Sequence, residues 1–212
     1  MSQNKGWNSE LAHIWTKMVG PSRPTISEIN IYMKHIRKLQ YTLNRKVKML
    51  ILGSTSEFRD LAFEENFDVT VVDCNETYYK NISREIRHKT LLDNEKVIFK
   101  KWQDLNFLDE FDVVIGDLVI GNVAPEEFEN FISCISNTLK QNGLFLSKSF
   151  FKIATYKVKN PKTLIKEYYE GPPIHPYSAF AYDLTIYSLD ENNLLEFKKQ
   201  YDILKNLILN LF

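Results

Sequence analysis

Short apolar runs alternate with longer helix-like segments along this chain, and that alternation limits the fold more than any other feature. Unbroken apolar runs of this length are typical of strands that are buried on both faces of a parallel sheet. They lie at Val47–Leu52, Val69–Val72, Val97–Phe99, Phe111–Ile115 and Leu144–Leu146, with helical segments predicted at Glu57–Asn66, Glu76–Leu92 and Pro125–Lys140. Strands that alternate with helices pair in parallel through right-handed crossovers. The sequence therefore predicts an α/β fold: a doubly wound, mainly parallel, Rossmann-like sheet with helices on both faces.

Three parts of the chain follow from this pattern. Residues 1–45 are predicted as an N-terminal helical segment, in which Thr25 and Glu28 form the capping box of a helix. Residues 46–152 form the predicted Rossmann-like core, and residues 153–212 a mostly helical C-terminal extension. No convincing strand pair follows Phe151, so we expect an atypical C-terminal end without a clear final pair of strands.

The composition excludes several classes of protein. The 212 residues carry 27 basic and 27 acidic side chains, are 44% hydrophobic, and contain no apolar run long enough to span a membrane. Cys74 and Cys134 lie far apart in the sequence, which favours neither a disulfide framework nor a metal site. The first residues lack the features of a secretory signal. We therefore expect a cytoplasmic protein without a metal, and the neutral charge disfavours a nucleic-acid partner.

The net charge of zero is the sum of two opposite parts. Residues 1–50 hold nine basic and two acidic side chains, a net charge of +7, which leaves −7 for residues 51–212. The simplest interpretation is a basic N-terminal segment that is attracted to an acidic body. Four basic side chains of this segment are expected to face outward, namely Lys34, Arg37, Lys38 and Arg45.

The candidate ligand-binding residues are those just after each predicted strand, because open α/β sheets bind ligands beyond the carboxyl ends of their strands. Gly53, Ser54 and Thr55 follow the first strand, where a glycine permits close backbone approach and a helix start offers free N–H groups. The loop matches neither the dinucleotide fingerprint nor the P-loop. Asp73 ends the second strand, where a carboxylate can accept both hydroxyls of a ribose. The alternative for Asp73 is a helix cap or a turn.

Five short motifs follow one another along roughly residues 10–150. They are Trp15 with Arg23-Pro24-Thr25 and Tyr32, then Leu50–Arg59, Trp102-Gln103-Asp104-Leu105, Gly116–Asn122, and Lys140-Gln141-Asn142-Gly143-Leu144. In this order they resemble the motifs of class I S-adenosylmethionine-dependent methyltransferases. Leu52-Gly53-Ser54-Thr55-Ser56-Glu57-Phe58-Arg59 is similar to the first loop of a subset that reads L-G-x-T-P-E-x-R.

The resemblance implies S-adenosylmethionine as the cofactor and S-adenosylhomocysteine as the product. In the family, the first loop lies at the methionine part of the cofactor, an acid after the second strand binds the ribose, and residues after the third strand contact adenine. Carried over to this sequence, the cofactor-binding residues are Gly53, Ser54, Thr55, Asp73, Cys74, Lys101, Trp102, Asp117 and Leu118. The resemblance also implies that residues 1–45 form an N-terminal helical lid, with Tyr32 and Arg23 near the methionine carboxylate. As an alternative, Trp15 and Tyr32 only pack the N-terminal segment onto the domain.

Two departures from the family pattern affect these expectations. The family usually has G-D before the tryptophan, where the acid accepts the adenine amino group, but this chain has Lys100-Lys101. Lysine has no acceptor, so adenine would rely on backbone contacts and stacking near Trp102. The chain also stops where relatives add two strands. We expect a homodimer, a partner subunit or the helical Asn193–Phe212 to cover the exposed sheet edge.

The catalytic candidates are Asp117 and Asn122, on the loop that faces the methyl group in the family. Asp117 is expected to orient the acceptor or take its proton, and Asn122 to hold the acceptor. The alternatives are a capping acid and a turn residue. The predicted function is methyl transfer to an O or N of a small molecule or peptide by in-line displacement. A non-catalytic or partner-completed subunit with weakened cofactor binding is the alternative, and the missing glycine fingerprint disfavours a nucleotide-dependent oxidoreductase.

Overall fold

The computed structural model describes residues 22–149, together with Trp15, Met18 and scattered positions between 160 and 206. The chain forms two compact units, Met1–Lys17 with Arg23–Phe150 and Met18–Ser22 with Phe151–Phe212. The sheet and all candidate site residues belong to the first unit. Most of the predicted C-terminal extension, including much of the helix expected at Asn193–Phe212, lies outside the described residues.

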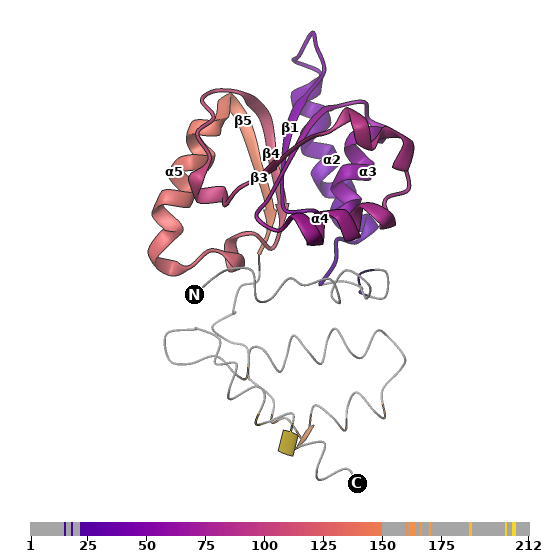
Figure 1. Cartoon of the computed structure of the whole chain (residues 1–212), viewed down its shortest axis with the longest axis vertical. Helices are drawn as coiled ribbons and strands as arrows, with labels where there is room; N and C mark the ends of the chain where they lie inside the picture. Colours follow the sequence, from indigo (N-terminus) through magenta and orange to yellow (C-terminus); the bar gives the residue numbers. More distant parts are fainter. Residues whose placement is uncertain are drawn as a thin grey trace. The chain divides into compact units, whose positions relative to one another are not determined.

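A five-stranded parallel sheet forms the centre of the first unit, with the strand order β3-β2-β1-β4-β5 (Figure 1). The strands are β1 (Lys48–Leu52), β2 (Asp68–Asp73), β3 (Lys96–Phe99), β4 (Phe111–Asp117) and β5 (Leu139–Lys148). The order reverses next to β1, where β2 lies on one side and β4 on the other. This arrangement confirms the predicted Rossmann-like, doubly wound sheet.

Helices cover both faces of the sheet, because alternate residues of each buried strand point to opposite sides. On one face, α2 (Ile26–Gln40) and α3 (Ser56–Glu64) pack against Met49, Ile51 and their neighbours. On the other face, Phe131 and Ile135 of α5 (Phe128–Thr138) pack against Leu50, Leu52 and Val114. Figure 1 shows α5 on one side of the sheet and α2, α3 and α4 (Glu76–Ile82) on the other.

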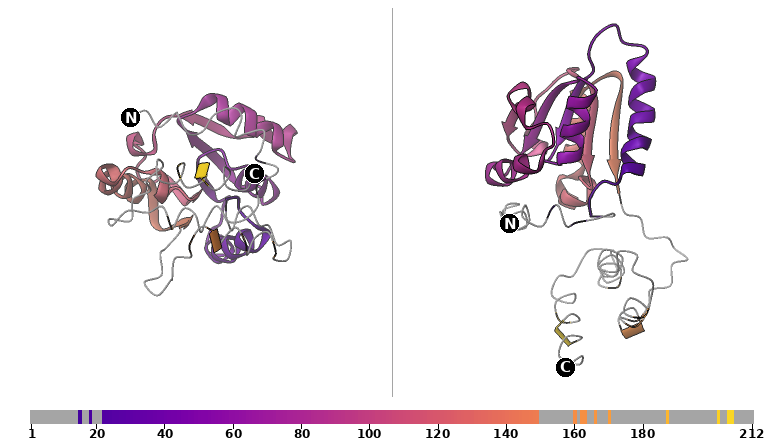
Figure 2. Two further views of the ribbon diagram at one scale, coloured as in Figure 1. Left: turned by 90° about the horizontal axis from the view of Figure 1, so that it is seen from below. Right: turned by 90° about the vertical axis from the view of Figure 1, so that its right-hand side faces the viewer.

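The helix α2 begins where the sequence predicts. Thr25 accepts a hydrogen bond from the Glu28 N–H, and the Glu28 carboxylate accepts one from the Thr25 N–H at 2.7 Å. From this cap the helix runs along the strands (Figure 2) and buries Met33 and Ile36 in the core. Each fully buried side chain of this size stabilises the fold by about 2 kcal/mol. Within the predicted lid, α2 therefore packs on a face of the sheet, and only its first turn reaches the carboxyl edge.

Two predicted helices end earlier than expected. The helix predicted over Glu76–Leu92 stops at Ile82, because the Asp60 carboxylate accepts hydrogen bonds from the N–H groups of Arg87 (2.9 Å) and His88 (3.2 Å). A side-chain acceptor thus replaces the carbonyl partners that a continuing helix would supply. The 3-10 turns Ser83–Glu85 and Lys89–Asn94 take its place.

The helix predicted over Pro125–Lys140 consists of a 3-10 turn at Pro125–Glu127, then α5, and it gives way to β5 at Leu139. The strand is therefore longer than the predicted Leu144–Leu146. Its pairing with β4 shifts register between Phe111 and Val113, and Lys140 lies 3.3 Å from the Asp112 carboxylate within that irregular stretch. The ion pair to a buried acid keeps Lys140 at the sheet, which the local sequence does not reveal.

The basic N-terminal segment is joined to the acidic body by ion pairs. Arg37 pairs with Glu65 at 2.9 Å, and Arg45 binds both oxygens of Asp112 at 2.6 and 2.7 Å. Both side chains are exposed, as are Lys34 and Lys38, so the expectation that these four basic side chains face outward is confirmed. Acceptors that lie far along the chain bind both guanidinium groups.

Candidate functional site

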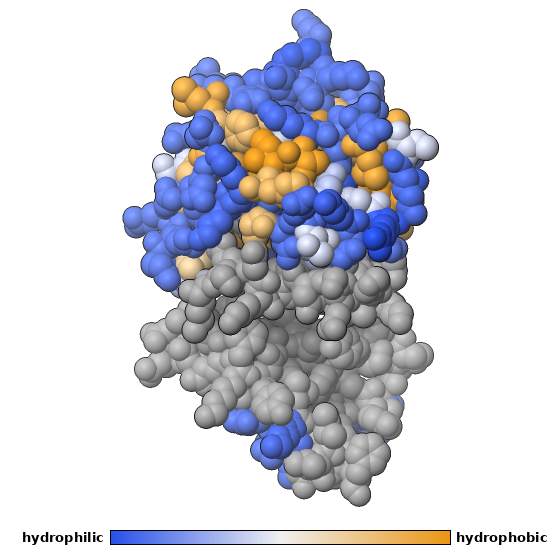
Figure 3. Space-filling view, viewed as in Figure 1, coloured by the Kyte–Doolittle hydropathy of each residue, from blue (hydrophilic) through white to orange (hydrophobic). Residues whose placement is uncertain are grey.

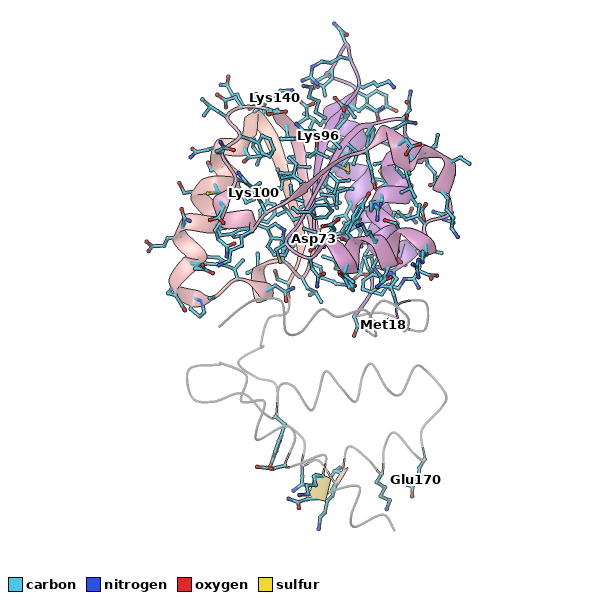
Figure 4. The ribbon with its side chains drawn as sticks, in the orientation of Figure 1. Met18, Asp73, Lys96, Lys100, Lys140 and Glu170 are labelled. Carbon is cyan, nitrogen blue, oxygen red and sulfur yellow. The ribbon has the colours of Figure 1, made fainter. Side chains whose placement is uncertain are left out.

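The carboxyl ends of the strands bring the predicted site residues to one edge of the sheet. In the parallel register Leu52 lies beside Val72 and Gly116, and Asp117 lies beside Lys148. Gly53, Asp73 and Asp117 therefore follow or end neighbouring strands at the same edge. Figure 4 shows Asp73 at this end of the sheet, with Lys96 and Lys140 toward the other end.

The loop after β1 turns sharply at Gly53, whose φ of +86° is a conformation that favours glycine. Its N–H donates a hydrogen bond of 2.8 Å to the Val72 carbonyl, which holds the loop against the end of β2. The following Ser54 and Thr55 are buried, and α3 starts directly after them. The conformation of Gly53 therefore favours a residue without a side chain at the point where the sequence predicts that a ligand approaches.

Asp73 is a buried carboxylate that binds the first loop. Its Oδ2 accepts a 2.5 Å hydrogen bond from the Ser54 hydroxyl, and its Oδ1 accepts one of 2.8 Å from the Asn75 N–H. Burial raises the pKa of Asp73 above its ordinary value, although these hydrogen bonds and the charge of Arg59 oppose the shift. The cap of α4 is Asn75, which accepts from the Tyr78 N–H. The helix-cap alternative for Asp73 is therefore wrong, while a turn-forming role coexists with its place at the edge.

Lys101, Trp102 and Cys74 lie on the side of the site next to β3. The Trp102 indole N–H donates to the same Val72 carbonyl at 3.1 Å, and a Cβ on Gly53 would lie 3.7 Å from its ring. Burial and the nearby Asp73 raise the pKa of the exposed Cys74 thiol, and the charge of Lys101 opposes that shift. Trp102 therefore borders the first loop as predicted, and Lys101 contributes a positive charge close to Cys74.

Glu127 belongs to this region, although the sequence places it only within the helix predicted over Pro125–Lys140. Its carboxylate lies 3.6 Å from the Lys101 ammonium and accepts a hydrogen bond of 3.0 Å from the Gln103 amide. An acid is thus present next to Lys101, although it comes from the loop after β4 rather than from β3. The pairing of Glu127 with Lys101 is not visible in the sequence, because 26 positions separate the two residues.

The loop after β4 has a constrained backbone. A Cβ on Gly116 would lie 2.4 Å from a methyl group of Val119, and Leu118 has a φ of +54°. The Asn122 amide donates to the Leu118 carbonyl at 3.1 Å and is exposed. Asn122 therefore supports its own loop, in agreement with the turn alternative.

Asp117 lies in a cluster of charged groups at the end of β4. The Lys148 ammonium lies 3.1 Å from Asp117 Oδ1 and 3.3 Å from Glu28 Oε1. The Asp117 side chain is 5% exposed and that of Lys148 is 12% exposed. Burial raises the pKa of Asp117 to about 6, with Lys148 opposing the shift and Glu28 and Glu57 adding to it. Lys148 lies just after the fifth predicted strand, and Glu28 is predicted as part of a capping box. The sequence does not show that these two residues meet Asp117, because the three residues come from separate parts of the chain.

The N-terminal candidates lie at the start of α3. The Trp15 indole N–H donates to the Ser56 hydroxyl at 2.9 Å, and the Arg23 guanidinium donates to Glu57 and to the Trp15 carbonyl. Tyr32 is buried in the core, and burial followed by the charges of Asp117 and Glu28 raises its pKa to about 12. Trp15 and Tyr32 thus pack the segment onto the domain, and Arg23 is brought to the edge of the site with an acidic partner.

Within residues 22–149 and the scattered positions, no three His, Cys, Asp or Glu side chains gather in a way that could hold a metal ion. No helix in the described part of the chain is long and apolar enough to cross a bilayer.

Comparison with known proteins supports the fold. No protein-family model and no curated protein sequence matches the chain. Among solved structures, a zinc-dependent alcohol dehydrogenase of Rhodobacter sphaeroides is similar over 94% of this chain and 71% of its own, with 18% identity and a TM-score of 0.55. An S-adenosylmethionine-dependent methyltransferase of Clostridium acetobutylicum is similar over 65% of this chain and 55% of its own, with 18% identity and a TM-score of 0.50. A TehB-like methyltransferase of Corynebacterium glutamicum has a TM-score of 0.47 at 16% identity, over 66% of this chain and 71% of its own.

The likenesses to the Rhodobacter dehydrogenase and to the Clostridium methyltransferase show a Rossmann-like α/β fold. The chain spans about half the length of the Clostridium methyltransferase that it resembles. Two enzymes of different reaction classes share this architecture, so function has to be argued from the residues at the edge of the sheet.

Proposed function

We propose that this protein is an S-adenosylmethionine-dependent methyltransferase that acts on an O or N of a small molecule or peptide. The observation that carries the proposal is the contact between Ser54 and Asp73, which joins the first loop to the carboxylate at the end of β2. This contact places a left-handed glycine, a carboxylate with two accepting oxygens and the charged end of β4 on neighbouring strands. That is the arrangement an adenosine-containing cofactor needs at the point where strand order reverses.

The residues of the edge fit the cofactor. The Asp73 carboxylate accepts a hydrogen bond from Ser54 at one oxygen and from the Asn75 N–H at the other. Each oxygen can accept a second hydrogen bond, which a ribose hydroxyl would donate. Gly53 and Thr55 would lie along the methionine part, and Arg23, which donates to Glu57 in the first turn of α3, would bind the methionine carboxylate. The remaining contacts are proposed for Ser54, Cys74, Lys101, Trp102, Leu118 and Tyr32.

The bound cofactor would supply an electrophilic methyl group on a sulfonium, and the chain supplies orientation and a proton acceptor. Orientation alone can account for much of the acceleration of a displacement. Asp117 lies almost buried at the end of β4, with a pKa raised to about 6 mainly by burial. Its carboxylate is ionised at neutral pH and basic enough to take a proton from an amine or hydroxyl. Asn122 holds the loop that carries Asp117 and Leu118 in shape.

The first loop separates this proposal from a dinucleotide-dependent oxidoreductase of the same fold. A dinucleotide site uses three glycines to bring the pyrophosphate onto the helix N-terminus. Here the loop reads Gly53-Ser54-Thr55-Ser56, and Thr55 and Ser56 are buried. The single glycine favours a cofactor without a pyrophosphate.

Calorimetric titration tests the proposal. We expect S-adenosylmethionine and S-adenosylhomocysteine to bind the wild-type protein, and NADH and NADPH not to bind. Asp73→Asn should weaken both interactions at least tenfold, since a ribose acceptor is lost. Asp68→Asn is the matched control, because Asp68 begins the same strand at the opposite edge and is exposed. Binding of NADH, or equal binding by the two variants, would reject the assignment.

One observation supports the alternative that this protein is a non-catalytic or partner-completed subunit. Lys101 presents an ammonium where an adenine acceptor is expected, and its neighbouring acid Glu127 is already paired with it. Absence of S-adenosylmethionine binding at millimolar concentration in the same titration would favour this alternative.

A homodimer or a partner subunit that covers an exposed strand is also part of the proposal, as is a cytoplasmic location. The strand β3 forms one edge of the described sheet, and Phe99 at its end is 43% exposed. Figure 3 shows an apolar area on this face of the described part. Exposed edge strands are sites of pairing between chains. Sedimentation velocity would distinguish a monomer from a dimer.

A further inference from the structure

The charged cluster at the end of β4 links three elements that are distant in sequence. Glu28 lies in the first turn of α2, Asp117 ends β4, and Lys148 ends β5. Lys148 lies between the two carboxylates, 3.3 Å from Glu28 and 3.1 Å from Asp117. A nearly buried ammonium with acids on both sides is costly to desolvate unless both contacts persist.

Glu28 has two functions in this arrangement. Its Oε2 accepts hydrogen bonds from the N–H and hydroxyl of Thr25, while its Oε1 pairs with Lys148. The capping box therefore fixes the Glu28 carboxylate before it meets Lys148. The position of the ammonium is set from the α2 side by a backbone-anchored acid and not by a freely rotating side chain.

We propose that Lys148 is a positioning residue of the site: its ammonium, held by Glu28, orients the Asp117 carboxylate and keeps it ionised for the methyl acceptor. This inference rests on the proposed function only for the presence of a methyl acceptor. The effect of the Lys148 charge on the Asp117 carboxylate does not depend on that function. In the transfer, the acceptor atom bonds to the methyl carbon as the carbon–sulfur bond breaks with its electrons going to sulfur. The proton that the acceptor loses passes to the Asp117 carboxylate and then to water.

Four titratable groups interact electrostatically with Asp117. Glu28 and Tyr32 face it from α2, Glu57 from the start of α3, and Lys148 from β5. Glu57 is itself neutralised in part by Arg23. Lys148 is therefore the cation in direct contact with Asp117, and the other groups near it are acids or a neutral phenol.

The titration of Asp117 measures the effect of Lys148 directly. The carboxyl carbon signal of Asp117 is assigned by its disappearance in Asp117→Asn and followed by carbon-13 NMR against pH. Lys148→Met should raise the pKa of Asp117 by about one to three units, since an opposite charge in contact has an effect of that size. Lys148→Arg should keep the value near that of the wild-type protein.

Glu28→Gln provides a test of opposite sign in a variant that keeps the capping box, because glutamine also serves at this position. Removal of its negative charge should lower the pKa of Asp117 by up to about one unit. An unchanged Asp117 pKa in both Lys148→Met and Glu28→Gln would overturn the proposal, and so would a shift of equal size in Lys148→Arg. If Lys148→Met does not fold, Glu28→Gln and Lys148→Arg decide the matter.

The two proposals fail separately. Shifts of the expected signs in a protein that does not bind S-adenosylmethionine would retain the cluster and reject the methyltransferase. Once an acceptor is found, Lys148→Met should lower kcat more than it raises KM, and should move the acidic limb of the kcat profile to higher pH. If Lys148 had only a structural role, Lys148→Met would change neither the balance between kcat and KM nor the position of the acidic limb.

Discussion

The Ser54 hydroxyl donates a hydrogen bond of 2.5 Å to the Asp73 carboxylate, across 19 positions of sequence and between the ends of two neighbouring strands. The contact fixes the first loop and the acid as one unit. It also stabilises the ionised form of a carboxylate whose burial raises its pKa. A ligand that binds Asp73 therefore meets an acceptor that is already oriented.

Ser54→Ala removes this orientation without removing the acceptor. We expect S-adenosylmethionine to bind about three- to tenfold more weakly, since a net hydrogen bond is worth about 1 kcal/mol. The Asp73 pKa should rise further, because a hydrogen bond to its charged form is lost. Calorimetry at pH 7 measures the affinity. Ser136→Ala, an exposed position on α5, is the control and should bind as the wild-type protein does.

Arg59 belongs to the first-loop motif, but its side chain forms a structural ion pair. The side chains of Arg59 and Glu95 are both 0% exposed, and the Arg59 guanidinium binds both Glu95 oxygens. The guanidinium also lies 4.5 Å from the centre of the Tyr79 ring. Arg59→Met should lower the free energy of unfolding by about 3–5 kcal/mol, because an unpaired buried carboxylate remains.

The double variant Arg59→Met with Glu95→Leu should recover most of that loss in urea unfolding, since both charges are removed. A single variant with wild-type stability but no S-adenosylmethionine binding would show instead that Arg59 acts on the ligand.

Asp112 should make stability depend on acid pH. Burial alone would raise its pKa, but hydrogen bonds from Arg45, the Lys48 N–H and Lys140 lower it to about 2. In the unfolded chain an aspartate titrates near 3.9. The contribution of about 2 kcal/mol is therefore fully present above about pH 4 and is lost as the pH falls through about 2.

Unfolding by urea at several pH values checks this expectation. Asp112→Asn should be less stable than the wild-type protein at pH 7, and the difference should shrink between pH 4 and pH 2. A difference that stays constant over that range would show that the ionisation of Asp112 is not its source.

Gly116 should tolerate no side chain while Val119 is present. A Cβ there would lie 2.4 Å from a Val119 methyl group and 3.1 Å from the Leu52 carbonyl. Gly116→Ala is expected to destabilise the protein by about 1–3 kcal/mol through overpacking. Adding Val119→Ala should restore part of the loss, and thermal unfolding of the two variants would measure it. Equal stability of Gly116→Ala and the wild-type protein would contradict the close packing of this loop.

Local patterns in the sequence are sufficient to predict the order and the type of the main elements of the fold. The apolar runs place all five strands, and Thr25 with Glu28 places the start of α2, because strand burial and capping depend on neighbouring residues. The ends of α4 and α5 differ from the prediction where a distant acid intervenes. Asp60 takes the N–H groups beyond α4, and Asp112 holds Lys140 at the sheet.

The same limit applies to the site. Gly53, Asp73 and Asp117 are predictable because each follows an apolar run. Lys148 also follows an apolar run, but its contact with Glu28 joins separate elements, as does the contact of Glu127 with Lys101, and no spacing in the sequence marks those pairs.

A crystal structure of the protein with S-adenosylhomocysteine tests the central claim most directly. We predict that both ribose hydroxyls lie within hydrogen-bonding distance of the Asp73 carboxylate, with the thioether sulfur beyond Gly53 on the side of Asp117. Density for the ligand away from the carboxyl ends of β1 and β2, or no density at saturating concentration, would contradict the account.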